Sequence, residues 1–274
     1  MGLLRHEKRD GSALTIPRLY YPCVLTVGDR CFLSEEHLHY VRSVQRMKPG
    51  SRLSLFDGRG QEYTAVIVDI SAERALAEII DRKSAPERPA RITLIQALPK
   101  GQKMDFIVQK ATELGVDEIL PFSSERSIPR LPPEKARLKT ERWRKIAGEA
   151  ARQCRRSDVP NIPEIQSFAG ILKAADADSL KMIFWEEESR QGLKDLLKKF
   201  SGTCIFSILV GPEGGLTSEE VEAATAAGFV SVSLGKQILK LETAAVAILA
   251  IIQYEVGLFG IGLENAQKAV ILEE

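Results

Sequence analysis

Two glycine-containing turns, separated by one short helix and one strand, place the strongest constraint on how this chain folds. Ser207 is followed by three apolar, β-branched or leucine residues at 208–210, and the segment 211–215 (GPEGG) after them cannot continue a strand. A second apolar run, 229–234, ends at Gly235. Each turn leads towards a helix, and glycine lets the main chain approach a ligand closely. The spacing predicts a binding site built from main-chain groups.

The helices that follow these turns have clear boundaries. Thr217 and Glu220 form a T-x-x-E capping box, so a helix is predicted to begin there. It is predicted to end near Ala227, because Gly228 suits the left-handed residue that closes a helix. After the second turn, residues 243–252 are apolar on almost every face, which predicts a deeply buried helix.

The two turns contain neither a P-loop nor a Rossmann fingerprint. As a pair, GPEGG and LGKQILKLETA (234–244) instead resemble the signature of the SPOUT methyltransferases, specifically the RsmE-type enzymes that methylate uridine N3 in 16S ribosomal RNA. The resemblance implies an α/β fold with a SPOUT-type parallel sheet and a C-terminal trefoil knot, with S-adenosylmethionine (AdoMet) against the knotted loops. Lys240 and Leu241 depart from the Arg-Thr that is usual in this family.

The first part of the chain has the pattern of a small, mostly antiparallel β domain. Strands are predicted at 24–27, 52–56, 62–68 and 75–80, with a hairpin at the Asp57-Gly58-Arg59-Gly60 turn. A helix is predicted over 35–44, with Ser34 as its N-cap.

Segments 39–50 and 55–63 of this part resemble the PUA-like β-barrel that precedes the methyltransferase domain in the same family. Such barrels contact RNA, and the cations predicted to do so here are Arg18, Arg42, Arg46 and Arg59. The predicted domains are 1–85 and 90–274, joined by a charged, proline-containing linker over 81–89. We expect the first ~15 residues to be disordered.

The second domain begins with a strand, a helix and a strand joined by short connections. The apolar runs 91–97 and 118–122 flank a predicted helix, 100–114, that Gly115 closes. This is a βαβ unit, which predicts a parallel sheet covered on both faces. The run 110–116 (KATELGV) also matches the family.

A basic segment over 126–156 contains eleven Lys or Arg and three Glu in a chain whose formal net charge is +1. Such a local excess favours a polyanionic partner. The end of its predicted helix, 138–154, leads into a family motif, A-A-E-Q-(S/C)-G-R, in which Arg152 replaces the usual Glu and Arg155 the usual Gly. The predicted RNA contacts in this segment are Arg152, Gln153 and Arg155.

Methylation of uridine N3 is an in-line displacement that needs alignment and removal of the N3 proton. Cations near O2 and O4 favour the resulting anion. The arginines predicted for this role are Arg126 and Arg156, and Arg18 is expected to help position the RNA. Glu242 is either a base or, as the safer assignment, a residue that caps the helix after it.

The resemblance also implies which residues enclose AdoMet: the two glycine turns and the loop after a predicted strand over 181–185. These residues are Trp185, Glu186, Gly211, Pro212, Glu213, Gly214, Gly215, Leu234, Gly235, Ile238, Leu239, Leu241, Thr243 and Ala244.

Composition agrees with a cytoplasmic enzyme of this kind. There is no signal peptide and no apolar run long enough for a membrane span, the four cysteines are scattered, and the three histidines are too few and too poorly placed for a metal site. We therefore predict an AdoMet-dependent 16S rRNA uridine-N3 methyltransferase that acts on the small ribosomal subunit as a homodimer. Two alternatives stay open: a SPOUT enzyme for another RNA such as tRNA, and a non-catalytic RNA-binding assembly factor.

Overall fold

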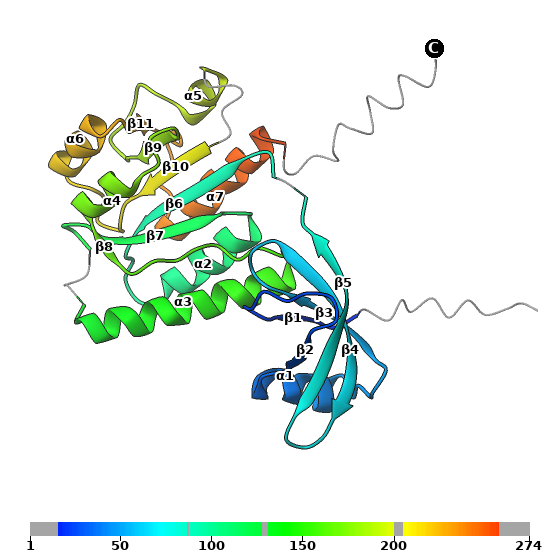
Figure 1. Cartoon of the computed structure of the whole chain (residues 1–274). Coiled ribbons are helices and arrows are strands. Elements are labelled where there is room, and N and C mark those ends of the chain that lie inside the picture. Colours follow the sequence, from blue (N-terminus) through cyan, green and yellow to red (C-terminus); the bar gives the residue numbers. More distant parts are fainter. Residues whose placement is uncertain (1–15, 87, 128–130, 200–204, 258–274) are drawn as a thin grey trace, which may run out of the picture. The chain divides into compact units, whose positions relative to one another are not determined.

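A computed structural model describes residues 16–86, 88–127, 131–199 and 205–257 of the 274-residue chain. The chain forms two compact units, Met1–Ser84 and Ala85–Glu274 (Figure 1). The N-terminal residues for which disorder is expected lie outside the described residues.

The smaller unit is built on a five-stranded sheet with the order β1-β3-β4-β5-β2. All neighbouring strands are antiparallel except β1 and β3, so the predicted antiparallel β domain is confirmed. The strands are β1 (Arg18–Tyr20), β2 (Arg30–Phe32), β3 (Arg52–Phe56), β4 (Gln61–Ile70) and β5 (Ala75–Ser84).

The hairpin between β3 and β4 forms at the predicted turn. The Oδ1 atom of Asp57 accepts hydrogen bonds from the amides of Arg59 (2.7 Å) and Gln61 (3.1 Å). Gly58 and Gly60 have φ values of 78° and 91°, which residues with a side chain rarely adopt. The predicted helix is also present: the Ser34 side chain caps α1 (Glu35–His39), which continues as a π-helical segment, Tyr40–Val44.

Three details of this unit differ from the prediction. Residues 24–27 are not a strand, because the Thr26 amide bonds Asp29 Oδ2 in a turn. The strands β1 and β2 were not predicted, because three residues are too short to show periodicity. The predicted linker starts too early, since Asp81–Ser84 continue β5 and pair with β4 despite their charge.

The larger unit is built on a six-stranded sheet in which every pair of neighbouring strands is parallel, which confirms the predicted α/β fold. The strand order is β11-β9-β10-β6-β7-β8. The strands are β6 (Arg91–Ala97), β7 (Glu118–Ser123), β8 (Gln166–Ser167), β9 (Leu180–Phe184), β10 (Ile205–Val210) and β11 (Val230–Val232).

Helices cover both faces of this sheet (Figure 1). One core cluster joins β6, β9 and β10 to α2, α3, α5 and α7, and another joins the opposite face to α4 and α6. None of the described helices is long and apolar enough to cross a membrane. The helices are α2 (Lys103–Glu113), α3 (Pro133–Gln153), α4 (Phe168–Ala174), α5 (Leu193–Lys199), α6 (Ser218–Ala226) and α7 (Leu241–Glu255).

The C-terminal part of the sheet domain follows the prediction with two corrections. The capping box of Thr217 and Glu220 is formed, and Gly228 closes α6 with a φ of 90°. However, α7 begins at Leu241 rather than at residue 243, and it is buried on one side only. Tyr254 is 72% exposed because no described element covers that side. The trefoil knot stays a prediction.

An ionic cluster joins several elements at the amino-terminal edge of the parallel strands. Arg88 forms ion pairs with Asp117 and with Asp158 (3.0 Å). Arg156 pairs with the same Asp158 (2.6 Å) and donates hydrogen bonds to the carbonyls of Thr112 (2.6 Å) and Val116 (2.9 Å). Burial raises the pKa of Asp158, but the hydrogen bond and charge of Arg156, together with Arg88, outweigh it and lower the pKa to about 2.

We predict that Asp158→Asn lowers the free energy of unfolding by about 2 kcal/mol at pH 7, because two arginines lose their shared carboxylate. A carboxylate whose pKa is lowered by folding stabilises the protein above its unfolded pKa, near 3.8, and loses this effect as the pH falls towards about 2. The stability difference between wild type and variant should therefore shrink over that interval.

Chemical denaturation at several pH values measures this difference. Asp178→Asn, at an exposed loop position, is the matched control and should change the stability little. Equal losses in the two variants, or a difference that does not depend on pH, would contradict the assignment.

Candidate active site

Four loops meet at the carboxyl-terminal edge of the parallel sheet. The strands β11, β9, β10 and β6 are consecutive neighbours and parallel, so the segments that follow them leave the same edge. These segments are 233–240, 185–192, 211–217 and 98–102. In α/β sheets, ligands bind in the crevice outside this edge.

The first glycine turn is closely packed against the segment after β9. Gly215 has a φ of 72°, and a Cβ atom there would collide with the carboxylate of Glu186. A Cβ on Gly211 would lie 2.9 Å from the Leu216 side chain. Glycine is therefore required at 215 both by the backbone conformation and by the position of Glu186.

The second glycine turn has unused main-chain donors. Among the described residues, the amides of 236–239 have no hydrogen-bond partner, and the Ile238 side chain is 92% exposed. The turn is attached to the segment after β9 by a hydrogen bond from the Ser233 amide to the Gln191 carbonyl (2.9 Å). Free amides and an exposed apolar side chain suit a ligand that has polar and apolar parts.

Lys103 links the first glycine turn to two helices. Its Nζ atom lies 3.0 Å from Glu213 Oε1 and 3.7 Å from Glu242 Oε2, and the Lys100 amide donates to both oxygens of Glu213 (3.0 and 3.2 Å). The hydrogen bond with Glu213 raises the pKa of Lys103. Burial raises the pKa of Glu213, but the bonds from Lys103 and the Lys100 amide outweigh it and lower the pKa.

The sequence analysis did not identify Lys100 or Lys103. The signal was available, because both follow the strand 91–97 at the edge where the glycine turns were expected. Glu242 lies in the first turn of α7, which agrees with the assignment of this residue as one that caps the helix. Its ion pair with Lys103 makes it part of this linkage.

Arg126 lies at the first glycine turn. It follows β7 in an exposed loop, and its Nη1 atom donates to the Gly214 carbonyl (3.0 Å). The same loop is anchored by the Glu125 amide, which donates to Glu220 Oε1 (2.9 Å). Since Glu220 also forms the capping box of α6, the helix fixes the position of Arg126 relative to the turn.

Arg156 is not close to Arg126 within the chain. The carbonyls that it contacts, of Thr112 and Val116, precede β7 and lie at the amino-terminal edge of the sheet, whereas Gly214 follows β10 at the other edge. Only 12% of the Arg156 side chain is exposed. Within one chain, Arg156 and Arg126 therefore lie at opposite edges of the sheet, and the contacts of Arg156 within the chain stabilise the fold.

Two of the predicted cofactor residues have side chains that contact other parts of the larger unit. Trp185 packs beside α6, where it lines a groove with Val221 and Thr225. Leu241 is 7% exposed and lies in the core. Of the other predicted residues in α7, Thr243 is exposed and Ala244 is half-buried.

The predicted RNA-binding arginines of the smaller unit differ in exposure. Arg42, Arg46 and Arg59 are exposed. The Arg18 side chain is 12% exposed; its guanidinium lies 3.8 Å from the centre of the Phe56 ring and pairs with Glu62 (3.1 Å). Arg18 therefore makes structural contacts within its own unit.

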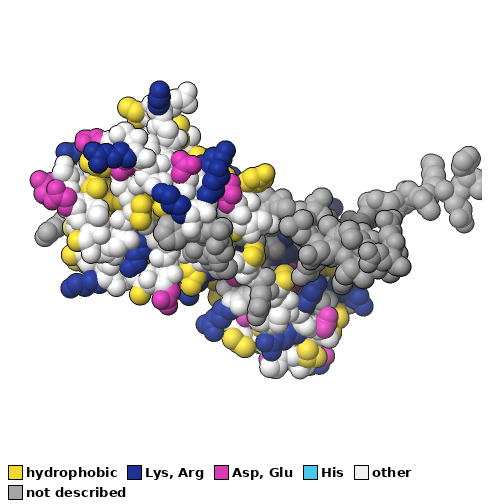
Figure 2. Space-filling model, turned by 90° about the horizontal axis from the view of Figure 1, so that it is seen from above, with side chains coloured by type: hydrophobic (Ala, Val, Ile, Leu, Met, Phe, Trp, Pro, Cys, Tyr) yellow, Lys and Arg dark blue, Asp and Glu magenta, His cyan; other side chains and the backbone are white. Residues whose placement is uncertain are grey.

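Carboxylates lie beside several cations of the basic segment in the folded chain, so its local charge is smaller than the sequence suggests. Elsewhere on the surface, on the face shown in Figure 2, Lys and Arg side chains are also interspersed with Asp and Glu. Arg152 is among the paired arginines, whereas Gln153 and Arg155 are exposed. Of the ten cations of this segment that the structure describes, five form ion pairs: Arg137 with Glu141, Arg142 with Asp105, Arg144 with Glu164, Arg152 with Glu149, and Arg156 with Asp158.

Within the described residues, no group of three or more His, Cys, Asp or Glu side chains is arranged to hold a metal ion. The groups that converge at the carboxyl-terminal edge are glycines, main-chain amides, one arginine and a Lys-Glu linkage. This set can enclose an organic ligand and stabilise negative charge beside it.

Comparison with known proteins identifies relatives over most of the chain. A family described as RNA methyltransferase domain matches residues 86–253, and one described as RNA methyltransferase PUA domain matches residues 25–80. The chain is 33% identical over 228 residues to a ribosomal RNA small subunit methyltransferase E of Bacillus subtilis, covering 81% of this chain and 89% of that protein.

Solved structures agree with this result. The crystal structure of a ribosomal RNA small subunit methyltransferase E from Neisseria gonorrhoeae, bound to S-adenosyl methionine, is 35% identical with a TM-score of 0.78, covering 87% of this chain and 97% of that one. A putative methyltransferase from Legionella pneumophila, in complex with the same cofactor, is 30% identical with a TM-score of 0.74, at coverages of 87% and 97%. With both domains matched and the glycine turns arranged as described, this chain belongs to the RNA methyltransferase family of the ribosomal RNA small subunit methyltransferase E type.

Proposed function

We propose that this protein is an AdoMet-dependent methyltransferase that methylates N3 of a uridine in 16S ribosomal RNA, on the small ribosomal subunit. The observation that carries the proposal is the contact of Arg126 with the Gly214 carbonyl, beside the loops that converge at the carboxyl-terminal edge. The membership of the chain in its family supports the same reaction.

The residues at this edge fit AdoMet. The packing of Gly215 against Glu186 brings the first turn and the segment after β9 together, with a carboxylate that can accept hydrogen bonds from ribose hydroxyls. The free amides of 236–239 supply donors, and Ile238 supplies an apolar surface. The holding residues proposed here are Glu186, Gly211, Pro212, Gly214, Gly215, Leu234, Gly235, Ile238 and Leu239.

The cofactor supplies a methyl group on a positively charged sulfur. The protein must then orient the uracil ring and favour the form without the N3 proton. The Arg126 guanidinium is exposed and carries further donors beyond the one bonded to Gly214, so it can stabilise negative charge on a uracil oxygen. Lys103 acts as a positioning residue, since it joins Glu213 of the glycine turn to Glu242 of α7.

A homodimer completes the proposal. Large apolar side chains are exposed on α2 and α7, which pack against each other: Phe106 is 45% exposed, Ile251 40% and Tyr254 72%. A second copy of the chain that covers this surface would remove it from water. We place the enzyme in the cytoplasm, with its ribosomal substrate.

The non-catalytic alternative has one specific observation in its favour. Lys240 stands at the N-cap of α7 and makes no side-chain capping bond, where the family pattern has Arg-Thr over 240–241. An assay of the product separates this alternative, and the tRNA alternative, from the main proposal.

We expect incubation with methyl-labelled AdoMet to produce N3-methyluridine in unmodified small ribosomal subunits and not in tRNA. Nucleoside digestion followed by mass spectrometry identifies the product, and naked 16S rRNA is assayed in parallel. A product in tRNA alone would favour the first alternative, and RNA binding without transfer would favour the second.

We predict that Arg126→Ala lowers kcat by about 10²–10³-fold, because one donor to a developing charge is lost. Its stability should stay within about 0.5 kcal/mol of wild type, since the side chain is exposed.

We predict the opposite pattern for Arg156→Ala. The free energy of unfolding should fall by about 3 kcal/mol, because Asp158 loses its closest partner, and kcat of the folded protein should change little. Denaturation and single-turnover assays on both variants test this contrast. A stable Arg156→Ala variant with low kcat would restore Arg156 to the catalytic site.

We predict that Gly215→Ala weakens AdoMet binding by about tenfold or more, because the added Cβ displaces Glu186. The control is Gly228→Ala, which has a similar positive φ of 90° and follows α6, so it carries similar strain without touching Glu186. Calorimetry measures both affinities. In a double-mutant cycle, adding Gly215→Ala to Glu186→Ala should cost less than adding it to wild type. Additive effects would separate Gly215 from Glu186, and unchanged affinity would remove both from the site.

A further inference from the structure

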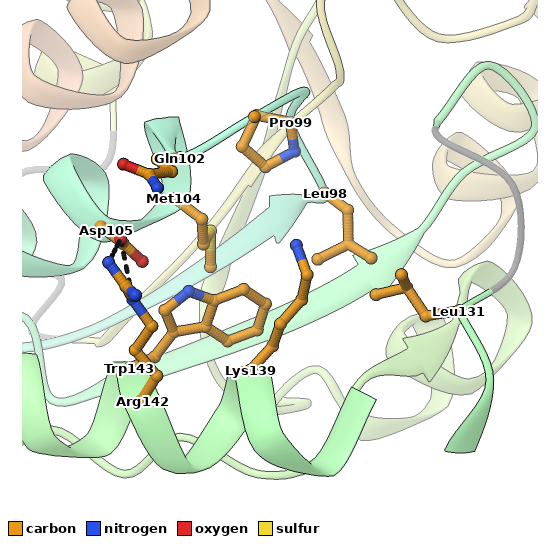
Figure 3. A pocket seen from close by; sticks show the side chains of 10 residues that line it. Leu98, Pro99, Gln102, Met104, Asp105, Leu131, Lys139, Arg142 and Trp143 are labelled. Atoms are coloured by element: carbon orange, nitrogen blue, oxygen red, sulfur yellow. Dashed lines mark hydrogen bonds and ion pairs between the residues drawn. The ribbon is translucent and has the colours of Figure 1, made fainter. Parts of the chain in front are cut away.

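A pocket with a cavity volume of about 270 Å³ lies between the segment after β6, the start of α2, and α3 (Figure 3). Its apolar lining includes Leu98, Met104 and Trp143, each less than 7% exposed. Pockets for drug-sized ligands have volumes of about 300–1,000 Å³, so this one suits a single small group. None of its lining residues was named individually as a site residue in the sequence analysis, although Lys139 and Arg142 belong to the basic segment 126–156.

The polar groups of the pocket are placed for a nucleotide. Trp143 is 2% exposed as a whole residue, and no hydrogen bond joins its indole N–H to another described residue. In Figure 3 the indole nitrogen lies on the ring edge turned towards Met104. A donor in an apolar slot selects a ligand that offers an acceptor, such as a ring carbonyl.

Lys139 supplies a charge at the same pocket. Figure 3 shows its side chain extending from α3 alongside Trp143, with the ammonium near Leu98 and Pro99. Lys139 has no ion-pair partner in the described part of the chain. Arg142, by contrast, is held by two hydrogen bonds to Asp105 Oδ2 (3.0 and 2.6 Å), which fix α3 against α2 and keep the wall of the pocket in place. The free cation therefore favours an anion beside the apolar slot.

The pocket is connected to the proposed methyl-transfer site. Lys100, which adjoins its lining residues, donates its amide to Glu213 of the glycine turn, and Lys103 in the same segment bonds Glu213 as well. The pocket shares the segment 98–102 with the carboxyl-terminal edge, but none of its lining residues belongs to the segments 185–192, 211–217 or 233–240. A group bound in the pocket is thus near the substrate of the reaction without being the uracil beside Arg126.

We propose that this pocket holds an unstacked nucleobase of the RNA, next to the nucleotide that is methylated, with Lys139 on its phosphate and the Trp143 N–H on a base oxygen or nitrogen. Proteins that recognise single-stranded RNA commonly enclose splayed bases in apolar sites and hydrogen-bond their edges, while a cation holds the backbone. This inference rests on the proposed function, because that function makes RNA the substrate.

The chain contains two tryptophans, so Trp185→Phe leaves Trp143 as the single reporter of the pocket. In this variant, with S-adenosylhomocysteine present, we expect a hexauridylate oligomer to change the Trp143 emission in a saturable manner. An oligomer of the same length with abasic nucleotides should bind about tenfold or more weakly and leave the emission unchanged. Equal binding of the two oligomers without an emission change would overturn the proposal.

Lys139→Glu and Lys145→Glu make the same charge change on the same helix, but Lys145 is exposed and does not line the pocket. We expect Lys139→Glu to lower the affinity for labelled hexauridylate about tenfold, and Lys145→Glu much less. Circular dichroism checks the folding of both variants, and equal losses would overturn the proposal.

The methylation assay on wild type separates the two claims. If rRNA is methylated but hexauridylate does not change the Trp143 emission, the pocket proposal is wrong and the proposed reaction stands. If hexauridylate changes the Trp143 emission but no RNA is methylated, the RNA subsite stands and the proposed reaction is wrong.

Discussion

The parallel register of the central sheet is the constraint on which the functional edge depends. Ile205 to Val210 pair residue by residue with Arg91 to Gln96, so the glycine turn after β10 begins beside the segment after β6. That register is what lets the Lys100 amide reach Glu213. A slip of one residue would turn every side chain of β10 to the other face of the sheet and move the glycine turn away from its partners.

The two edges of this sheet have different physical characters. At the amino-terminal edge, Arg88 and Arg156 share Asp158 and bond main-chain carbonyls, so charges that are partly removed from water are well paired. At the carboxyl-terminal edge, glycine backbones and free amides leave bonding capacity for a ligand. Binding loops need main-chain groups that are not hydrogen-bonded within the protein, and such loops contribute little stability. The packing at the amino-terminal edge supplies stability that the carboxyl-terminal edge does not.

The sequence predicted the elements that local chemistry determines. The capping box of α6, the hairpin turn at Asp57 and the βαβ unit each depend on residues within one short window. Three-residue strands such as β1 are defined by distant partners, so no window contains them. Arg126 and Arg156 belong to one basic segment, but proximity in sequence does not tell which edge of a sheet a side chain reaches. The apolar composition of α7 likewise could not tell which side of the helix is covered.

The departure of this chain from the family pattern at Leu241 is consistent with retained activity. A threonine there would offer a hydroxyl at the start of α7, whereas the Leu241 side chain packs into the core and is 7% exposed. The helix start is still supported, because Glu242 places a carboxylate in its first turn, where the helix dipole favours negative charge. Lys103 holds that carboxylate together with Glu213 of the glycine turn. The position of the turn relative to α7 is thus set by an ionic link that residue 241 does not join, and replacing threonine by leucine leaves this link intact.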